Sequence, residues 1–219
     1  MGMMEKSSCM KQETRYTTVS FLASILFFMS HSPLRRRFVL ALPALAVLSA
    51  CSAEQEFGIP TKQALSMSAI EQYATGFDAG SKTSTRRVFV FFDPQCPHCA
   101  RFWEETKVLA SQARFTWIPV HLMNRASIAQ GATILAADSP LRAMDEHETA
   151  FMASGGRGGI TAADVPPQFR AAVTKNTRLF ESFDLHGVPL IVGQNVKTGA
   201  LYSHQGGMPA VQLAQRLGW

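Results

Sequence analysis

A run of five apolar, β-favouring residues, Val88 to Phe92, is the feature that most constrains the fold of this chain. Its length and composition indicate a strand buried on both faces, with layers packed on either side of a sheet. Asp93 and Pro94 end the strand. A helix is predicted from Pro97 to about Gln112, with proline at a tolerated first-turn position. Phe115 to Val120 is a second buried strand, so the β-α-β order predicts a parallel pair in an α/β domain.

Further elements are predicted on both sides of this unit. We expect a short helix over Ser66–Phe77, capped by Ser66 or Ser68, and then a charged connector over Gly80–Arg87. Three helices are predicted after the second strand, over Ser127–Ala137, Pro140–Ala153 and Pro167–Leu185. A hairpin of Val188–Val192 with Ala200–Ser203 follows them, and the last predicted helix is Pro209–Gly218. This order is similar to a thioredoxin fold with a helical insertion.

The net charge of +5 does not point to a nucleic-acid partner. Residues 1–50 hold six of the 21 Lys and Arg residues and only two of the 16 Asp and Glu residues. The remaining 15 basic and 14 acidic residues leave the rest of the chain close to neutral. The basic character therefore belongs to the N-terminal segment, and a basic binding stripe is not indicated.

Residues 1–50 have the layout of a secretory signal. Arg35-Arg36-Arg37 precedes an apolar stretch, Phe38–Ala50, whose 13 residues are too few to span roughly 30 Å of bilayer as a helix. Pro43 and the lack of a polar face weaken the alternative of a core helix. Residues 1–28 fit an over-extended start, with Met29 a more economical one. A loose likeness to twin-arginine signals leaves the export route open, with ordinary secretion favoured.

Leu48-Ser49-Ala50-Cys51 resembles a bacterial lipobox. The resemblance implies a lipid anchor at Cys51, cleavage just before it, and a Gram-negative periplasmic protein held at a membrane. Cleavage near Ala53 by an ordinary signal peptidase is the alternative. We expect residues 51–86 to form a tether with one short helix, and residues 87–219 to form the catalytic domain.

Cys96-Pro97-His98-Cys99 lies at the predicted strand-to-helix junction. Two cysteines at this spacing can close a small disulfide ring. Unpaired N–H groups and the helix dipole favour a thiolate at Cys96 and lower its pKa, and we expect the His98 ring to add to this. A zinc site is the alternative, but the predicted domain offers no second ligand pair at metal spacing, so we expect no metal. An inert structural disulfide remains the other alternative.

His186-Gly187-Val188-Pro189 precedes a predicted strand. Proline cannot donate to a sheet ladder, so its place here indicates either special geometry or an ordinary loop. In thioredoxin-like proteins the proline at this place is cis and packs beside the reactive disulfide.

Several other residues are interpreted as structural. The remaining histidines (His121, His147, His204) are interpreted as ordinary polar or packing residues, and Trp103 and Trp117 as core residues. Glu104-Glu105 is interpreted as a solvated helix face.

The segment from Phe91 to Cys99, followed by Phe102-Trp103, resembles the active site of the DsbG and DsbC family. The likeness continues through residues 136–140 and 153–156 and ends at Gly187-Val188-Pro189, covering roughly residues 87–219. It implies a periplasmic thiol:disulfide interchange protein whose redox centre is the Cys96–Cys99 disulfide, with no other cofactor. Cys96 would be the solvent-facing attacking cysteine and Cys99 the buried resolving one. Asp93, Pro97 and His98 would support them, and Val188 and Pro189 would line the substrate groove.

Two departures from that family affect the expected activity. About 35 residues separate Cys51 from the first strand, too few for the family's N-terminal dimerisation domain and linker helix, so a monomer is expected. Cys-Pro-His-Cys and Gly-Val-Pro look more like the oxidase DsbA. Reduced or misfolded proteins are the expected substrates, with a membrane redox partner of the DsbB or DsbD kind. Oxidase, isomerase and reductase activities stay open. So do reduction of sulfenic acids or of one dedicated client, and a non-enzymatic lipoprotein that carries metal or assists assembly.

Overall fold

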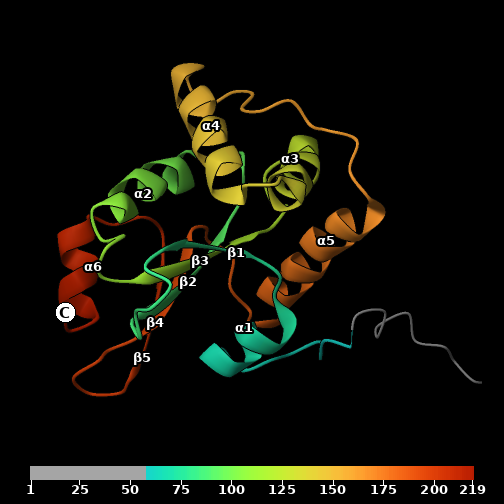
Figure 1. The fold of residues 1–219 in the computed structure, drawn as a ribbon. Helices are drawn as coiled ribbons and strands as arrows, with labels where there is room; N and C mark the ends of the chain where they lie inside the picture. The colour runs from blue at the N-terminus through green and yellow to red at the C-terminus, as the bar shows by residue number, and fades with distance from the viewer. Residues whose placement is uncertain (1–57) are drawn as a thin grey trace, which may run out of the picture. The chain divides into compact units, whose positions relative to one another are not determined.

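The computed structural model describes residues 58–219. The predicted leader over residues 1–50 and the predicted anchor at Cys51 lie outside the described residues. The described chain forms six helices and five strands, in the order α1 (Met67–Tyr73), β1 (Phe77–Gly80), β2 (Arg87–Phe92), α2 (Pro97–Lys107), β3 (Arg114–Pro119), α3 (Arg125–Ala136), α4 (Pro140–Ala153), α5 (Pro167–Ser182), β4 (Leu190–Gln194), β5 (Leu201–Gln205) and α6 (Ala210–Arg216). The predicted helical insertion lies in the part of the chain between β3 and β4, which forms α3, α4 and α5 (Figure 1).

The five strands form one sheet in the order β1-β3-β2-β4-β5. β2 and β3 are parallel, with Val90 opposite Trp117, as the β-α-β pattern predicts. β4 runs antiparallel to β2 and pairs with β5 as a hairpin, which is also as predicted. β2 is therefore the central strand, and its carboxyl end leads directly into Asp93 and the cysteine pair.

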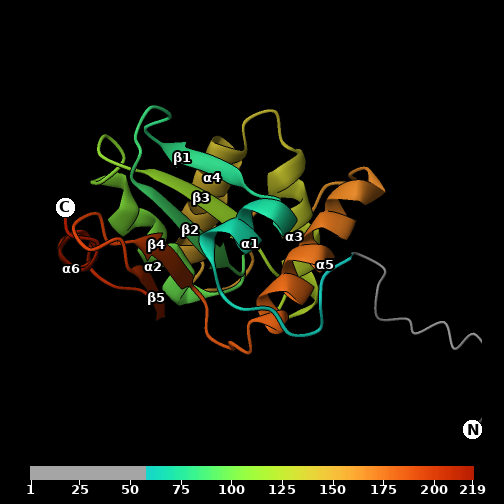
Figure 2. The ribbon, with the colours of Figure 1, turned by 90° about the horizontal axis from the view of Figure 1, so that it is seen from below.

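The side chains of β2 alternate between two apolar cores, one on each face of the sheet. Val88, Val90 and Phe92 belong to the core that also holds Cys96, Cys99 and residues of α2 and α6. Phe89 and Phe91 belong to the other core, with residues of α1 and α5. Figures 1 and 2 show α1 and α5 side by side on their face of the sheet. The prediction of a strand buried on both faces is confirmed.

The predicted helix over Ser66–Phe77 is wrong at its C-terminal end. Ser66 does cap α1, accepting a hydrogen bond from the Ala69 amide, but α1 ends at Tyr73. Phe77 begins β1, an edge strand that pairs antiparallel with β3 and that the sequence pattern missed. Pairing with β3 overrides the helix propensity of this segment. The sequence pattern missed the strand because four residues are too few to show a clear alternation.

The remaining helices follow the predictions, apart from their ends. α4 has the predicted bounds, whereas α2 stops at Lys107 instead of about Gln112, and α5 stops at Ser182 instead of Leu185. Tight turns replace the last predicted turn of α2: the amides of Leu109 and Ala110 bond to carbonyls three residues back. Of the helices between residues 58 and 219, none combines the length and apolar composition that crossing a membrane requires.

Candidate redox-active site

The cysteine pair lies where the central strand passes into α2. Cys96 is the N-cap residue of α2 in extended conformation, and Pro97 occupies the first turn. The Cys96 amide bonds to the Asp93 carbonyl at 3.0 Å, and the Cys96 carbonyl accepts from the amides of Cys99 and Ala100. The backbone thus holds the Cys96 side chain at the helix N-terminus, where free N–H groups point toward it.

The structure holds both cysteines as free thiols, and both are buried. Cys99 is fully buried and Cys96 is 3% exposed, so the expectation that Cys96 faces solvent is wrong for this state of the protein. The Cys96 thiol donates to the Val188 carbonyl, with Sγ and O 3.6 Å apart. The Val188–Pro189 peptide bond is cis. The Val188–Pro189 loop and the cysteine pair, 92 residues apart in the sequence, therefore lie in direct contact.

The two thiols have opposite acid–base character. A hydrogen bond from the Cys99 thiol, aided by the backbone N–H groups of Cys99 and His98, lowers the pKa of Cys96 to about 7. Burial and the charge of Asp93 oppose this lowering. Burial raises the pKa of Cys99 well above its usual range. At neutral pH Cys96 is therefore partly ionised, whereas Cys99 stays protonated.

The His98 ring does not contribute to that lowering in the expected way. His98 is exposed, and its Nδ1 accepts a hydrogen bond from the Arg101 guanidinium at 2.9 Å. The stabilising contribution of His98 to the Cys96 thiolate comes from its backbone N–H. Arg101 is therefore a site residue that the sequence analysis missed.

Asp93 is fully buried and holds together the loops behind the site. Its two carboxylate oxygens accept from the amides of Gln95, Leu122 and Met123 and from the hydroxyl of Ser127, at 2.6 to 2.9 Å. Ser127 also belongs to the capping box that starts α3. This carboxylate therefore connects the end of β2, the turn after β3 and the start of α3, which is a positioning role rather than a reactive one.

His147 and the glycine-rich segment 155–159 hold the other side of the active-site turn. The buried His147 ring contacts the Pro94 carbonyl through Nε2 at 2.6 Å and accepts the Ile160 amide on Nδ1 at 3.1 Å. Burial lowers the pKa of His147, which favours the neutral ring. Gln95 donates to the Gly158 carbonyl. His147 is thus a positioning residue, a role that the interpretation as an ordinary polar or packing histidine did not include.

Glu148, the next residue on α4, is a buried acid near the cysteines. It is 1% exposed, and neither carboxyl oxygen has a hydrogen-bond partner within the described part of the chain. Burial, followed by the negative charge of Cys96, raises its pKa to about 9. Glu148 in turn helps to raise the pKa of Cys99. A single acidic residue in a helix has no sequence signal that would reveal this placement.

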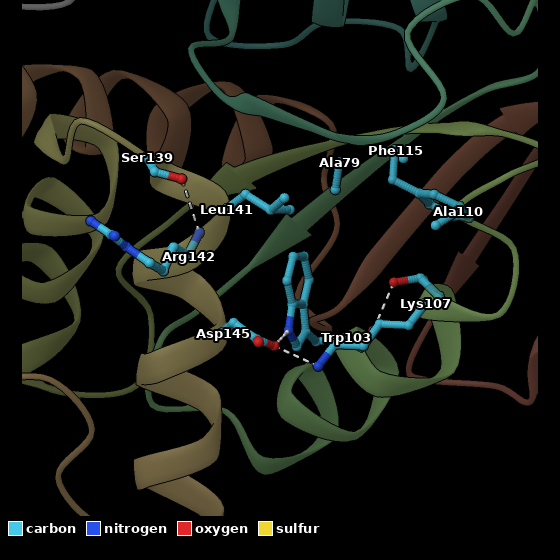
Figure 3. A pocket seen from close by; sticks show the side chains of 11 residues that line it. Ala79, Trp103, Lys107, Ala110, Phe115, Ser139, Leu141, Arg142 and Asp145 are labelled. Carbon is cyan, nitrogen blue, oxygen red and sulfur yellow. Dashed lines mark hydrogen bonds and ion pairs between the residues drawn. The ribbon is translucent and has the colours of Figure 1, made fainter.

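A cavity of about 410 Å³ lies elsewhere, against the far part of α2 and the start of α4 (Figure 3). Its wall includes Trp103, whose indole N–H donates to Asp145, and Lys107, which pairs with the same carboxylate. Neither cysteine lines it. Within residues 58–219, no group of three or more His, Cys, Asp or Glu side chains is arranged to hold a metal ion.

An asymmetric cysteine pair at the start of the helix that follows the central strand, beside a proline loop, defines a thioredoxin-like protein. The chain belongs to the thioredoxin-like domain family, which it matches over residues 78–218. It is similar to the thiol:disulfide interchange protein DsbG of Pseudomonas aeruginosa, with 33% identity over 141 residues, covering 64% of this chain and 54% of that protein. DsbG of Escherichia coli is 28% identical over 115 residues, or 51% of this chain and 45% of that protein.

Solved structures share the fold at low sequence identity. Proteus mirabilis ScsC in a compact conformation has a TM-score of 0.53 and 18% identity, covering 74% of this chain and 81% of that one. Pseudomonas aeruginosa DsbA2 also has a TM-score of 0.53, with 16% identity, covering 65% of this chain and 92% of that one. The chain spans about half the length of the two DsbG proteins it matches. The predicted thioredoxin fold and the predicted likeness to DsbG are confirmed.

Proposed function

We propose that this chain is a periplasmic thiol–disulfide oxidoreductase that exchanges disulfides with protein substrates through Cys96 and Cys99. The observation that carries the proposal is the difference between the two thiols: Cys96 has a pKa of about 7, and Cys99 is fully buried with a raised pKa. A good thiolate leaving group beside a protonated partner is what disulfide exchange requires. The likeness to two thiol:disulfide interchange proteins supports it.

The exchange proceeds in two displacements. A client thiolate attacks Cys96 Sγ of the Cys96–Cys99 disulfide, a client–Cys96 bond forms, and Cys99 leaves with the electron pair. A second client thiolate then attacks the client sulfur of this mixed disulfide and releases the Cys96 thiolate. The client gains a disulfide and loses two electrons, and the protein ends as the reduced dithiol. The low pKa of Cys96 favours the second displacement, because a weaker base leaves faster.

Glu148 is suited to handle the proton of Cys99. With a pKa of about 9, its carboxyl is protonated at neutral pH and can supply the proton that the departing Cys99 thiolate takes up. No hydrogen bond to another described residue competes for this carboxyl group.

Trapping tests the proposal directly. Acid quenching and alkylation of cells should capture the pair in a defined redox state, with a mostly oxidised pair supporting an oxidase and a mostly reduced pair an isomerase or reductase. Cys99→Ala should accumulate mixed disulfides with client proteins, because Cys96 can still attack a client disulfide but Cys99 is no longer present to displace the bound client. Cys96→Ala should form none. Equal amounts of mixed disulfide in the two variants would overturn the assignment of Cys96.

Net oxidation is the favoured direction within this proposal. The stabilised Cys96 thiolate favours the reduced pair, so the Cys96–Cys99 disulfide is a correspondingly stronger oxidant of client thiols. We expect a monomer that oxidises reduced, unfolded protein faster than it repairs scrambled protein, and that a membrane redox partner of the DsbB kind reoxidises. Sedimentation and refolding assays test this. A stable dimer with strong repair would favour an isomerase, served by a DsbD-like partner.

Export and anchoring belong to the proposal as well. Acylation of Cys51 would hold the domain at the membrane surface of the periplasm. Cys51→Ser should release the protein into the soluble periplasmic fraction or leave its leader uncut, as seen by fractionation and by the mass of the mature N-terminus. If the variant fractionates like the wild type, the anchor is wrong and cleavage near Ala53 becomes the better interpretation.

A further inference from the structure

We propose that the site prefers client segments that carry carboxylates next to the reacting cysteine, because the chain segments that meet beside Cys96 carry cationic and N–H-donating side chains. This inference rests on the proposed disulfide exchange and adds the class of client segment that the exchange favours. It is carried by the composition and placement of four chain segments that meet at the N-terminus of α2: residues 96–101, 155–159, 185–189 and 204–208.

Contacts place these four segments together. The Val188 carbonyl lies 3.6 Å from Cys96 Sγ. The position that a Cβ atom would take on Gly156 is 3.6 Å from Pro97 Cγ, and on Gly207 it is 3.3 Å from the His98 carbonyl oxygen. The Gln205 side chain accepts the amides of residues 186 and 187, which fixes the end of β5 to the Val188–Pro189 loop.

The charges of these segments have one sign. None of the four contains Asp or Glu, whereas together they carry Arg101 and Arg157 and three histidines (His98, His186, His204). All five side chains are exposed. A guanidinium is always charged and can hold a carboxylate with two parallel hydrogen bonds, and an imidazole offers an N–H donor.

We call these five exposed side chains the rim. The carboxylates nearest to them in sequence do not neutralise the rim. Asp93 is fully buried beneath it and bonded to three amides and a hydroxyl. On the second and third turns of α2, Glu104 pairs with Lys107, and Glu105 accepts the Ala210 amide at the start of α6. Asp184 is the exception: it is exposed and lies 4.0 Å from His186, where it offsets part of one side. Arg101 and Arg157 belong to two of the other segments.

The reach of these side chains matches an extended client. Arg101 follows Cys96 by five residues, which is about 7.5 Å along a helix axis. A client chain extended across Cys96 advances about 3.3 Å per residue. A carboxylate two or three residues from the client cysteine therefore lies about 7 to 10 Å away along that chain, which is comparable to the axial distance from Cys96 to Arg101.

Matched peptides test the preference. Each peptide carries two cysteines at one spacing, flanked two residues away by Glu, by Gln or by Lys. The second-order rate of peptide oxidation by the oxidised full chain is measured at neutral pH in low and high salt. Each rate is divided by the peptide's rate with a small uncharged disulfide, because flanking charges alter the peptide thiol itself. We expect the corrected Glu rate to exceed the Gln rate about three- to tenfold in low salt, and to approach it in high salt.

Substitutions assign the preference to the rim. Arg157→Gln and Arg101→Gln should each lower the ratio of Glu to Gln rates, and the double variant should bring it to about one. Lys197→Gln is the matched control: it removes an exposed cation beyond the far end of β4 and should keep the wild-type ratio. Equal corrected rates for all peptides with the wild type, or an unchanged ratio in the double variant, would overturn the proposal. No oxidation of any peptide would instead count against the proposed function.

Discussion

At the scale of single residues, the Cys99 thiol is the largest contributor to the low pKa of Cys96. Cys99→Ala should therefore raise the pKa of Cys96 from about 7 toward the ordinary thiol value of about 8.5. His98→Ala should leave it near the wild-type value, since the backbone N–H remains and the ring is engaged by Arg101. The pH dependence of alkylation measures both. A rise in His98→Ala equal to that in Cys99→Ala would restore the role first expected for the ring.

Glu148 makes a second prediction at this scale, because burial without a partner makes its charged form costly. Its pKa is about 9 in the fold against 4.5 ordinarily, so the folded state keeps a proton that the unfolded chain releases. Stability should fall as pH rises from about 5 toward 9, by at most about 1.4 kcal/mol per pH unit from this group. Urea unfolding across this range should show a smaller decline for Glu148→Gln. Glu146→Gln, on the exposed side of α4, should decline like the wild type.

At the scale of elements, α4 and the glycine-rich segment hold the active-site turn in position. Gly159 has a φ of +88°, and a Cβ atom there would collide with the His147 ring. Gly159→Ala should therefore destabilise the protein by about 2 to 4 kcal/mol, combining backbone strain with displacement of the ring. Gly155→Ala is the matched control, with a φ of +70° and no atom near the added Cβ. It should cost about 1 to 2 kcal/mol in urea unfolding. Equal losses would mean that the His147 contact is not needed.

At the scale of the whole molecule, the sheet separates two cores, and only one contains the cysteines. Phe91 packs against Phe180 and Phe183 on the α5 face, whereas Phe92 packs against Trp117 on the α2 face. Phe91→Leu and Phe92→Leu should each destabilise the fold by about 1 to 2 kcal/mol. Only Phe92→Leu should also change the alkylation rate of Cys96, because its core continues into the redox site. A matching change in Phe91→Leu would show that the two faces are coupled.

Local sequence patterns were sufficient to predict the architecture around the site. The apolar runs of β2 and β3 and the helix between them predicted a parallel pair, because burial on both faces and short connections leave few other arrangements. The proline-containing helix start predicted where Cys96 would lie, and local backbone geometry alone accounts for that position. These features depend on residues close together in the chain, so periodicity and spacing reveal them.

The surroundings of the cysteines, in contrast, depend on contacts between distant parts of the chain. β1 exists because β3 offers a pairing edge, although its four residues lack a strand pattern of their own. His147 and Glu148 lie about 50 residues beyond the cysteines in the sequence. Packing of α4 against the active-site turn makes His147 a positioning residue and Glu148 a buried acid. Burial and long-range contacts assign such roles, and both depend on how the helices pack, which local patterns in a single sequence do not encode.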